Sequence, residues 1–425
     1  MRVIWLTMVP LGVSLAAGTS PPPVTFHQDV LPVLQKNCQG CHRPGEAAPM
    51  SFLTYKDTRP WAKAIREAVV LKKMPPWFAD PHVGKFRNDP SLSDAEKATL
   101  IRWADSGAPE GDPGQAPAPR RLLEGWNIGE PDRIIEMPLE YAVPASGTIE
   151  YTYFIVPTGF AEDKWVQMAE ARPGNRKVVH HVIAFVREPG SSWLRDAKPG
   201  EPFVPRKGGD TGSLGEFLVG YAPGVVPQVL EPGQAKWIRA GSDIVLQMHY
   251  TANGRPEKDR TRIGFTFAKQ PPAKRVLTLA ASNRKFVIPP GAGNHRVDAQ
   301  VTLQEDSTLL AMIPHMHLRG KSFAFRVVYP TGEIQELLQV PRYSFNWQLS
   351  YLPKKPIGLP KGSRIECTAY FDNSANNPDN PNPGAEVRYG DQSWEEMMFG
   401  FFDVAVDVRV GPGDMLRGRK APVTD

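Results

Sequence analysis

The sequence predicts a multidomain protein in which a small all-α domain precedes two all-β, jelly-roll-like sandwich domains. Three observations predict this order. Apolar residues recur at helical spacing before about residue 110, a stretch rich in Pro and Gly follows, and short β-branched and aromatic runs recur from about residue 125 onward. The 425 residues are enough for two or three domains, and 41% hydrophobic with 22% charged residues fits a folded globular protein.

The first 18 residues have the features of a secretory signal peptide, which is removed on export. Arg2 supplies the positive start, residues 3–17 supply the apolar core, and Ala16, Ala17 and Gly18 offer a cleavage site. The alternative is an uncleaved anchor, but the apolar run is short for a membrane span and contains Pro and Gly. We therefore expect a periplasmic or secreted protein with no membrane span after cleavage, since no other stretch is long and apolar enough.

Cys38, Cys41 and His42 form the pattern C-x-x-C-H, which is the attachment signature of c-type haem. The two thiols would bond the vinyl groups of haem c, and the adjacent imidazole would bind its iron. A redox C-x-x-C pair and half of a zinc site are the alternatives. The chain has only three cysteines, so a second zinc-binding pair is missing, and no βαβ pattern surrounds the motif as a redox pair would require.

The sequence around this motif predicts a few short helices. One spans residues 27–36, and a second, amphipathic helix spans residues 58–72. A third follows the capping box of Ser93 and Glu96 and ends at Gly107. Short helices around a covalent macrocycle are similar to a small cytochrome c domain, which we place at residues 19–110.

A methionine is the expected sixth ligand of the iron if its potential is raised. Met74 is the favoured candidate, because the two prolines that follow it stiffen the loop that would present the sulfur. Met50 and His82 are the alternatives, with packing and an exposed loop position as their simpler roles.

A linker is predicted at residues 111–124, where frequent Pro and Gly favour an extended, semi-stiff spacer. The strand-like runs beyond it are typical of β-sandwiches rather than βαβ units. The remaining length suffices for two sandwiches of ordinary size. A Gln-Pro-Pro turn at residues 270–272 divides them into a first sandwich at 125–271 and a second at 272–425.

Five of the nine histidines fall in three strand-like runs, and a methionine pair, Met397 and Met398, follows two glutamates. The five are His180, His181, His249, His315 and His317. His315 and His317 are two residues apart, so an extended strand aims both side chains at the same face. Two imidazoles with a thioether favour copper that cycles through Cu(I), whereas three imidazoles suit copper or zinc.

The order and spacing of these residues resemble the copper type II, ascorbate-dependent monooxygenases, the family of peptidylglycine hydroxylating monooxygenase and dopamine β-monooxygenase. The resemblance covers about residues 125–410 and includes the Asn-rich tract at 371–378. It implies an electron-transfer copper held by three histidines and an oxygen-binding copper held by two histidines and a methionine. These sets map onto His180, His181 and His249, and onto His315, His317 and Met397, with Met398 as the less favoured sulfur.

Two local expectations follow from these assignments. Neighbouring side chains of a regular strand point to opposite faces, so joint ligation by His180 and His181 requires a β-bulge or a strand end. Cys367 has no partner left once haem takes the other two cysteines, so we expect a buried free thiol. The animal members of the family are rich in disulfides, and this chain departs from them.

The substrate is expected to differ from that of the peptide-amidating members. Those proteins clamp a carboxylate with an arginine and polar residues, and Ile313, Phe399 and Phe401 occupy the corresponding positions here. A buried carboxylate without a partner would be costly, so we expect a small apolar or aromatic substrate.

The sequence thus predicts an exported monooxygenase that uses O2 to hydroxylate a C–H bond, with two copper ions and one haem c. Electrons would come from an ascorbate-like reductant or a redox protein, and the fused haem suggests a supply within the chain. The alternative is a non-catalytic haem and copper electron carrier or copper-binding protein. The net charge of only +5 and the absence of a basic stripe interleaved with aromatic residues argue against nucleic acid.

Overall fold

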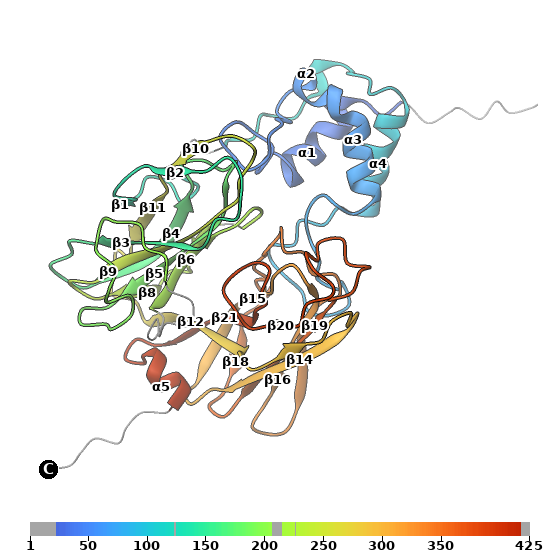
Figure 1. The fold of residues 1–425 in the computed structure, drawn as a ribbon. Coiled ribbons are helices and arrows are strands. Elements are labelled where there is room, and N and C mark those ends of the chain that lie inside the picture. The colour runs from blue at the N-terminus through green and yellow to red at the C-terminus, as the bar shows by residue number, and fades with distance from the viewer. Residues whose placement is uncertain (1–22, 123–124, 206–214, 226, 418–425) are drawn as a thin grey trace, which may run out of the picture.

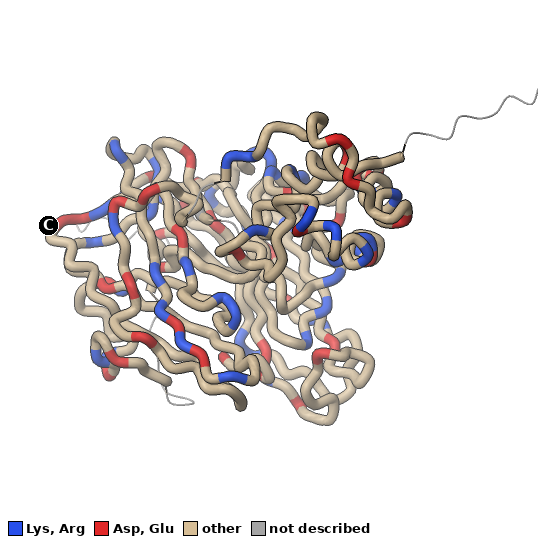
Figure 2. The backbone as a smooth tube through the Cα atoms, turned by 90° about the horizontal axis from the view of Figure 1, so that it is seen from above, with Lys and Arg blue, Asp and Glu red and all other residues tan. Residues whose placement is uncertain are grey.

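The computed structural model describes residues 23–122, 125–205, 215–225 and 227–417, and it is mostly β-sheet with a small helical unit on the N-terminal side (Figure 1). The predicted signal peptide lies outside these residues. Among the helices of these four ranges, none combines the length and the apolar character that a membrane crossing needs. Lys and Arg are interspersed with Asp and Glu along the backbone (Figure 2).

The helical unit has the short helices that the sequence predicted. They are η1 Phe26–Val30, α1 Leu31–Asn37, α2 Tyr55–Thr58, η2 Arg59–Trp61, α3 Ala62–Val70 and α4 Asp94–Asp105. The capping box is confirmed, because Ser93 Oγ accepts from the backbone N–H of Glu96 and the Glu96 carboxylate accepts from that of Ser93. The predicted helix over 58–72 begins earlier and contains the tighter turn η2, where Pro60 has no backbone N–H to donate. Phe26, Leu34 and Trp103 lie in the core of the unit.

The predicted linker, residues 111–124, is not a free spacer over most of its length. The Arg120 guanidinium donates to the backbone carbonyl of Gln35 at 2.7 Å. Gln35 Nε2 donates to the carbonyl of Ala118, and a short helix, η3 Pro113–Gln115, packs beside η1. The composition favours extended backbone, but that backbone finds hydrogen-bond partners on the helical unit.

The first β unit packs two sheets around one apolar core. One sheet has the order β3-β9-β5-β6, and the other begins β1-β11-β4-β8. Its strands are β1 Arg133–Glu136, β2 Tyr141–Val143, β3 Thr152–Pro157, β4 Lys164–Arg172, β5 Val179–Arg187, β6 Glu216–Tyr221, β7 Gln228–Val229, β8 Gln234–Ile238, β9 Asp243–Tyr250, β10 Glu257–Asp259 and β11 Arg262–Phe267. Phe154, Leu246 and Phe265 are fully buried between the sheets.

The second β unit repeats this two-layer arrangement. The sheet β12-β21-β15-β18 covers the sheet β14-β19-β16-β17. The elements are β12 Lys274–Asn283, β13 Val287–Ile288, β14 His295–Thr302, β15 Ser307–His315, β16 Gly320–Val328, β17 Ile334–Val340, β18 Ile357–Leu359, β19 Arg364–Phe371, β20 Val387–Arg388, β21 Met398–Asp407 and α5 Pro412–Arg417. Cys367 is a buried free thiol in this core, as the sequence predicted.

The two β units are joined edge to edge. Strands β8 and β12 pair in parallel, Gln234 with Lys274 and Ala235 with Arg275, so that one sheet runs through both units. The fully buried Lys236 donates to the backbone carbonyls of Phe217 and Leu218, which ties β8 to β6. The predicted boundary at 271/272 lies in the connection between β11 and β12. This junction fixes the two sandwiches relative to each other and so positions the histidines of both.

Candidate metal centres

Three histidines of the first sandwich converge on one point. His181 and His249 are directly opposite each other on β5 and β9. The Nδ1 atom of His181 lies 3.2 Å from that of His180 and 3.3 Å from that of His249. One ligand nitrogen of each residue lies within 4.8 Å of the other two. This is the spacing of three donors that face a single ion, and the sequence predicted these three residues as a set.

A β-bulge makes this convergence possible. Along β5 and β9, Val179 pairs with Tyr250 and His181 pairs with His249, so His180 is an extra residue without an opposite partner. The bulge interrupts the strict alternation of side chains and allows two neighbouring residues to share a face. The expected irregularity at His180 is therefore confirmed.

Burial keeps these imidazoles neutral. Burial, followed by the neighbouring histidines, lowers the pKa of His180 to about 4 and that of His249 to about 3. The pKa of His181 is also well below its ordinary value, for the same two reasons. His180 Nε2 is buried without a hydrogen-bond partner. A neutral imidazole is the form that binds a metal, so these three histidines can act as ligands without first losing a proton.

A second pair of histidines belongs to the second sandwich. His315 ends β15 and His317 lies in the turn that follows, with ring centroids 5.3 Å apart. His315 Nδ1 lies 2.8 Å from Oε1 of Gln348, and His317 Nδ1 lies 3.2 Å from the backbone carbonyl of Glu395. These contacts orient both rings and leave each Nε2 for a metal, and Nε2 of His317 is buried without a partner.

Glu396 connects the methionine pair to the His-x-His turn. Its buried carboxylate accepts from the backbone N–H groups of His317 at 2.8 Å and Arg319 at 2.6 Å, and burial raises its pKa to about 8. Met398 is fully buried in the core of the second sandwich, whereas Met397 is half-buried and packs outside that core. Met397 is thus the methionine of the pair whose sulfur is not committed to that core.

The two histidine groups face each other across one aromatic ring. Phe345 stacks on His180 with a centroid distance of 4.8 Å, and its centroid lies 6.0 Å from that of His317. Ser393, from the loop before Glu396, brings its Oγ to 3.3 Å from Nε2 of His249. Sequence reasoning missed Phe345 and Gln348, because both lie in an irregular loop where no periodicity marks a residue for a role.

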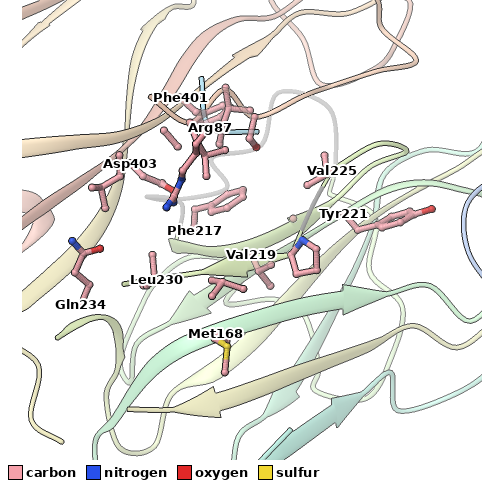
Figure 3. Close-up of a pocket in the computed structure, with 18 of the residues that line it drawn as sticks. Arg87, Met168, Phe217, Val219, Tyr221, Val225, Leu230, Gln234, Phe401 and Asp403 are labelled. Atoms are coloured by element: carbon pink, nitrogen blue, oxygen red, sulfur yellow. The ribbon is translucent and has the colours of Figure 1, made fainter. Parts of the chain in front are cut away.

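A cavity of about 800 Å³ opens between the sandwiches and reaches both histidine groups through His181 and His315. Figure 3 shows Phe217 and Val219 of β6 and Phe401 of β21 around this space. Its lining is mainly aliphatic and aromatic, and it includes Phe401 and Ile313, two of the three positions at which the sequence lacked a carboxylate clamp. The cavity is suited to an apolar ligand.

The C-x-x-C-H residues lie in a tight turn after α1. The backbone N–H groups of Cys41 and His42 both donate to the carbonyl of Cys38. Cys41 is exposed and Cys38 is half-buried, and burial raises the pKa of the Cys38 thiol to about 12. His42 Nδ1 is buried without a partner, and its ring stacks on Phe52. Two adjacent thiols and an unpartnered imidazole nitrogen fit covalent haem.

The candidates for a sixth ligand are placed differently. Met50 is partly buried and packs against the core of the helical unit. Met74 begins a segment that leaves that unit for the second sandwich. There the centroid of the Trp77 ring lies 4.8 Å from that of Tyr351, and the backbone N–H of Asp80 donates to the carbonyl of Gln339. His82 follows on the same exposed segment. The backbone of Met50 is hydrogen-bonded to His42, but among the described residues no hydrogen bond or ring contact joins the side chain of Met50, Met74 or His82 to it, so Met74 stays a prediction.

Comparisons with known proteins add no assignment. No protein-family model matches the chain, and no curated protein matches it. The structure of infectious bursal disease virus, Gx strain, is similar over 68% of this chain and 75% of that chain, with 10% identity and a TM-score of 0.19. The VP2 subviral particle of infectious bursal disease virus has 9% identity over 69% of this chain and 76% of that chain, with a TM-score of 0.19. Likenesses this low carry no argument about function.

Proposed function

We propose that the protein is a dicopper monooxygenase, similar to the copper type II, ascorbate-dependent enzymes, that hydroxylates a C–H bond of an apolar substrate. One observation carries the proposal: two histidine groups, each from a different sandwich, open onto the same apolar cavity through His181 and His315. A storage or carrier site needs neither a second group nor a cavity of about 800 Å³ beside it.

The donor sets favour copper. The three imidazoles of His180, His181 and His249 would hold one ion. The Nε2 atoms of His315 and His317 would hold the other, with the Met397 thioether as the soft ligand that suits Cu(I). Copper in these groups supplies one-electron redox chemistry toward O2.

The chain's own residues would position the reaction. Gln348 and the Glu395 carbonyl hold the His315 and His317 rings so that each Nε2 is directed away from its Nδ1 partner. Phe217 and Phe401 bind the substrate by apolar contact and exclude water. In the overall reaction, O2, two electrons and two protons convert a C–H bond into C–OH and release one water.

The helical unit would supply electrons as a small cytochrome c-like domain. Cys38 and Cys41 would bond haem c, and His42 with Met74 would bind its iron. Haem contributes a one-electron store, and an ascorbate-like reductant or a redox protein would refill it. Export by the N-terminal 18 residues is part of the same proposal, because haem attachment to C-x-x-C-H accompanies export.

Oxygen-18 labelling tests the proposal. Copper-loaded, reduced protein is incubated with 18O2 and a panel of small aromatic and aliphatic compounds. We expect one labelled hydroxyl in a product and substrate-dependent O2 consumption, both lost in His315→Ala and kept in His295→Ala, whose histidine lies on β14 outside both groups. Copper binding with O2 consumption that no compound stimulates would instead identify an electron carrier.

A further inference from the structure

The loop after C-x-x-C-H is bound to the first sandwich by a cluster of charges around Glu46. The Glu46 carboxylate pairs with Arg43 of its own loop at 3.4 Å, with Arg172 at 3.4 Å and with Arg176 at 3.3 Å. Arg172 ends β4 and Arg176 lies in the loop before β5, so two of the three partners belong to the sandwich. The Glu46 side chain is only 11% exposed. A charge buried to this degree needs its partners, so the cluster constrains how the two units meet.

A second set of contacts extends the joint. Arg43 donates to Oδ1 of Asn127 at 3.1 Å. Asn127 in turn donates to Glu170 from its side chain at 2.9 Å and from its backbone at 2.6 Å, and Glu170 pairs with Arg172 at 2.8 Å. The network therefore closes on itself, with three arginines and two carboxylates. This joint holds the helical unit in place, whereas the composition of residues 111–124 alone predicted only a tether.

Tyr221 lies between this joint and the three-histidine group. The Arg176 guanidinium sits over the Tyr221 ring at 5.1 Å from its centroid. Tyr221 ends β6 and is paired there with Val182, the residue that follows His181 on β5. Figure 3 shows the Tyr221 ring directed away from the other labelled residues of the cavity. The loop that begins at Cys41 thus approaches the sandwich at the end of the strand next to His181.

We propose that the Glu46 cluster is a permanent docking joint that holds the haem-bearing segment against the end of β4 and the loop before β5, with Tyr221 of β6 as the positioning residue between it and the three-histidine group. With haem and copper bound, one electron would pass within the chain: iron(II) would be oxidised to iron(III), copper(II) would be reduced to copper(I), and no bond or proton would be exchanged. This inference rests on the proposed function and deepens it, because it names the contact that would hold the haem-bearing segment beside the three-histidine group.

Anaerobic stopped-flow tests the joint without substrate or turnover. Protein with reduced haem and oxidised copper is followed by the haem absorption bands over a range of protein concentrations. For the unmodified chain we expect a single-exponential reoxidation whose rate does not depend on concentration. Glu46→Gln removes one carboxylate from the three arginines and should slow the haem reoxidation by about tenfold or more. A donor that is tethered but not docked must first diffuse to its acceptor. Glu110→Gln, on an exposed pair within the helical unit, should leave it unchanged.

Three further variants separate the positioning role of these side chains from an effect on folding. Tyr221→Leu should slow the reoxidation while solution scattering shows the same compact particle, and Tyr221→Phe should retain most of the rate. If Glu46→Gln fails to fold, Arg176→Leu removes one of the two sandwich-side partners of Glu46 and should slow the reoxidation in the same direction. A rate proportional to protein concentration in the unmodified chain, or a rate unchanged in all of these variants, overturns the joint. If the joint is overturned, formation of the 18O-labelled hydroxyl product with an external reductant would still support the proposed monooxygenase function.

Discussion

The ring of Phe345 stacks on the ring of His180, with centroids 4.8 Å apart and planes inclined by 19°. Phe345 belongs to the second sandwich and His180 to the first, so this contact crosses the boundary between them. The same ring lies near His317, which makes it the wall that the two histidine groups share. The predictions below follow from this arrangement and from the contacts that orient each group.

Phe345→Ala should expose His180 to reagents. Because the phenyl ring covers one face of the imidazole, its removal should speed diethyl pyrocarbonate modification of His180 severalfold in metal-free protein, measured by peptide mass spectrometry. Phe286→Ala is the control, since Phe286 stacks on Phe371 within the second sandwich. An unchanged rate at His180 in Phe345→Ala would mean that the ring does not cover it in solution.

Met397→Ala and Met398→Ala should separate binding from folding. Met398 is fully buried, so its truncation should cost about 2–5 kcal/mol of unfolding free energy. Met397 is half-buried, and its truncation should cost less than about 1 kcal/mol while removing the sulfur ligand. Chemical denaturation measures the unfolding free energy of both variants, and X-ray absorption of the copper(I) protein reports the copper–sulfur contact. Sulfur scattering that persists in Met397→Ala would assign the ligand to another residue.

Gln348→Leu should weaken only the second copper site. The side chain loses the acceptor for His315 Nδ1, so the ring is no longer held, and copper affinity there should fall by about tenfold to hundredfold. Titration against a competing chelator measures both sites. The matched change Gln335→Leu, at an exposed position of β17, should leave both affinities unchanged. An equal loss of copper affinity at the three-histidine site in Gln348→Leu would contradict the view that each histidine group is oriented by its own contacts.

Copper binding to the three-histidine group at pH 6 should release few protons. Histidines with ordinary pKa values would release about two, since most are protonated at that pH. Burial lowers the pKa of His180 to about 4 and that of His249 to about 3, so these imidazoles are already neutral. Calorimetry in buffers of different ionisation enthalpy counts the protons, and a release of two would show that the pKa values are not lowered.

The same pKa shifts fix the sign of a stability effect. In the unfolded chain these histidines take up protons near pH 6.5, whereas in the fold they do so only near pH 3 to 4. Their contribution to the stability of the metal-free protein is therefore complete above pH 6.5 and is lost as the pH falls toward 4. Glu396, whose pKa is raised to about 8, has the opposite sign and contributes less as the pH rises from 4.5 to 8. Measuring the unfolding free energy of Glu396→Gln as a function of pH separates the contribution of Glu396 from that of the histidines.

Sequence reasoning found the parts whose signals are local. The capping box at Ser93, the strand-like runs and the bulge at His180 each follow from neighbouring residues, and the structure contains all three. The convergence of His180 and His181 with His249 was implied by the resemblance to the copper monooxygenases, and the structure brings these three residues together.

The parts that sequence reasoning missed depend on how the units meet. The local sequence around Phe345 and Glu46 does not indicate a partner in another domain, because Phe345 contacts His180 and Glu46 contacts Arg172, both distant in the sequence. The pairing of β8 with β12, which makes one sheet of two sandwiches, is likewise set by packing between the units rather than by either strand alone.

The central claim is that the chain holds two coppers and one haem, and metal analysis of protein matured with haem-attachment machinery tests it most directly. We expect two copper ions per chain and one haem that acidified organic solvent does not extract. His249→Ala should remove one copper and His317→Ala the other, with the haem retained in both. Zinc in place of copper after reconstitution with both metals, one ion in all, or an extractable haem would contradict the account.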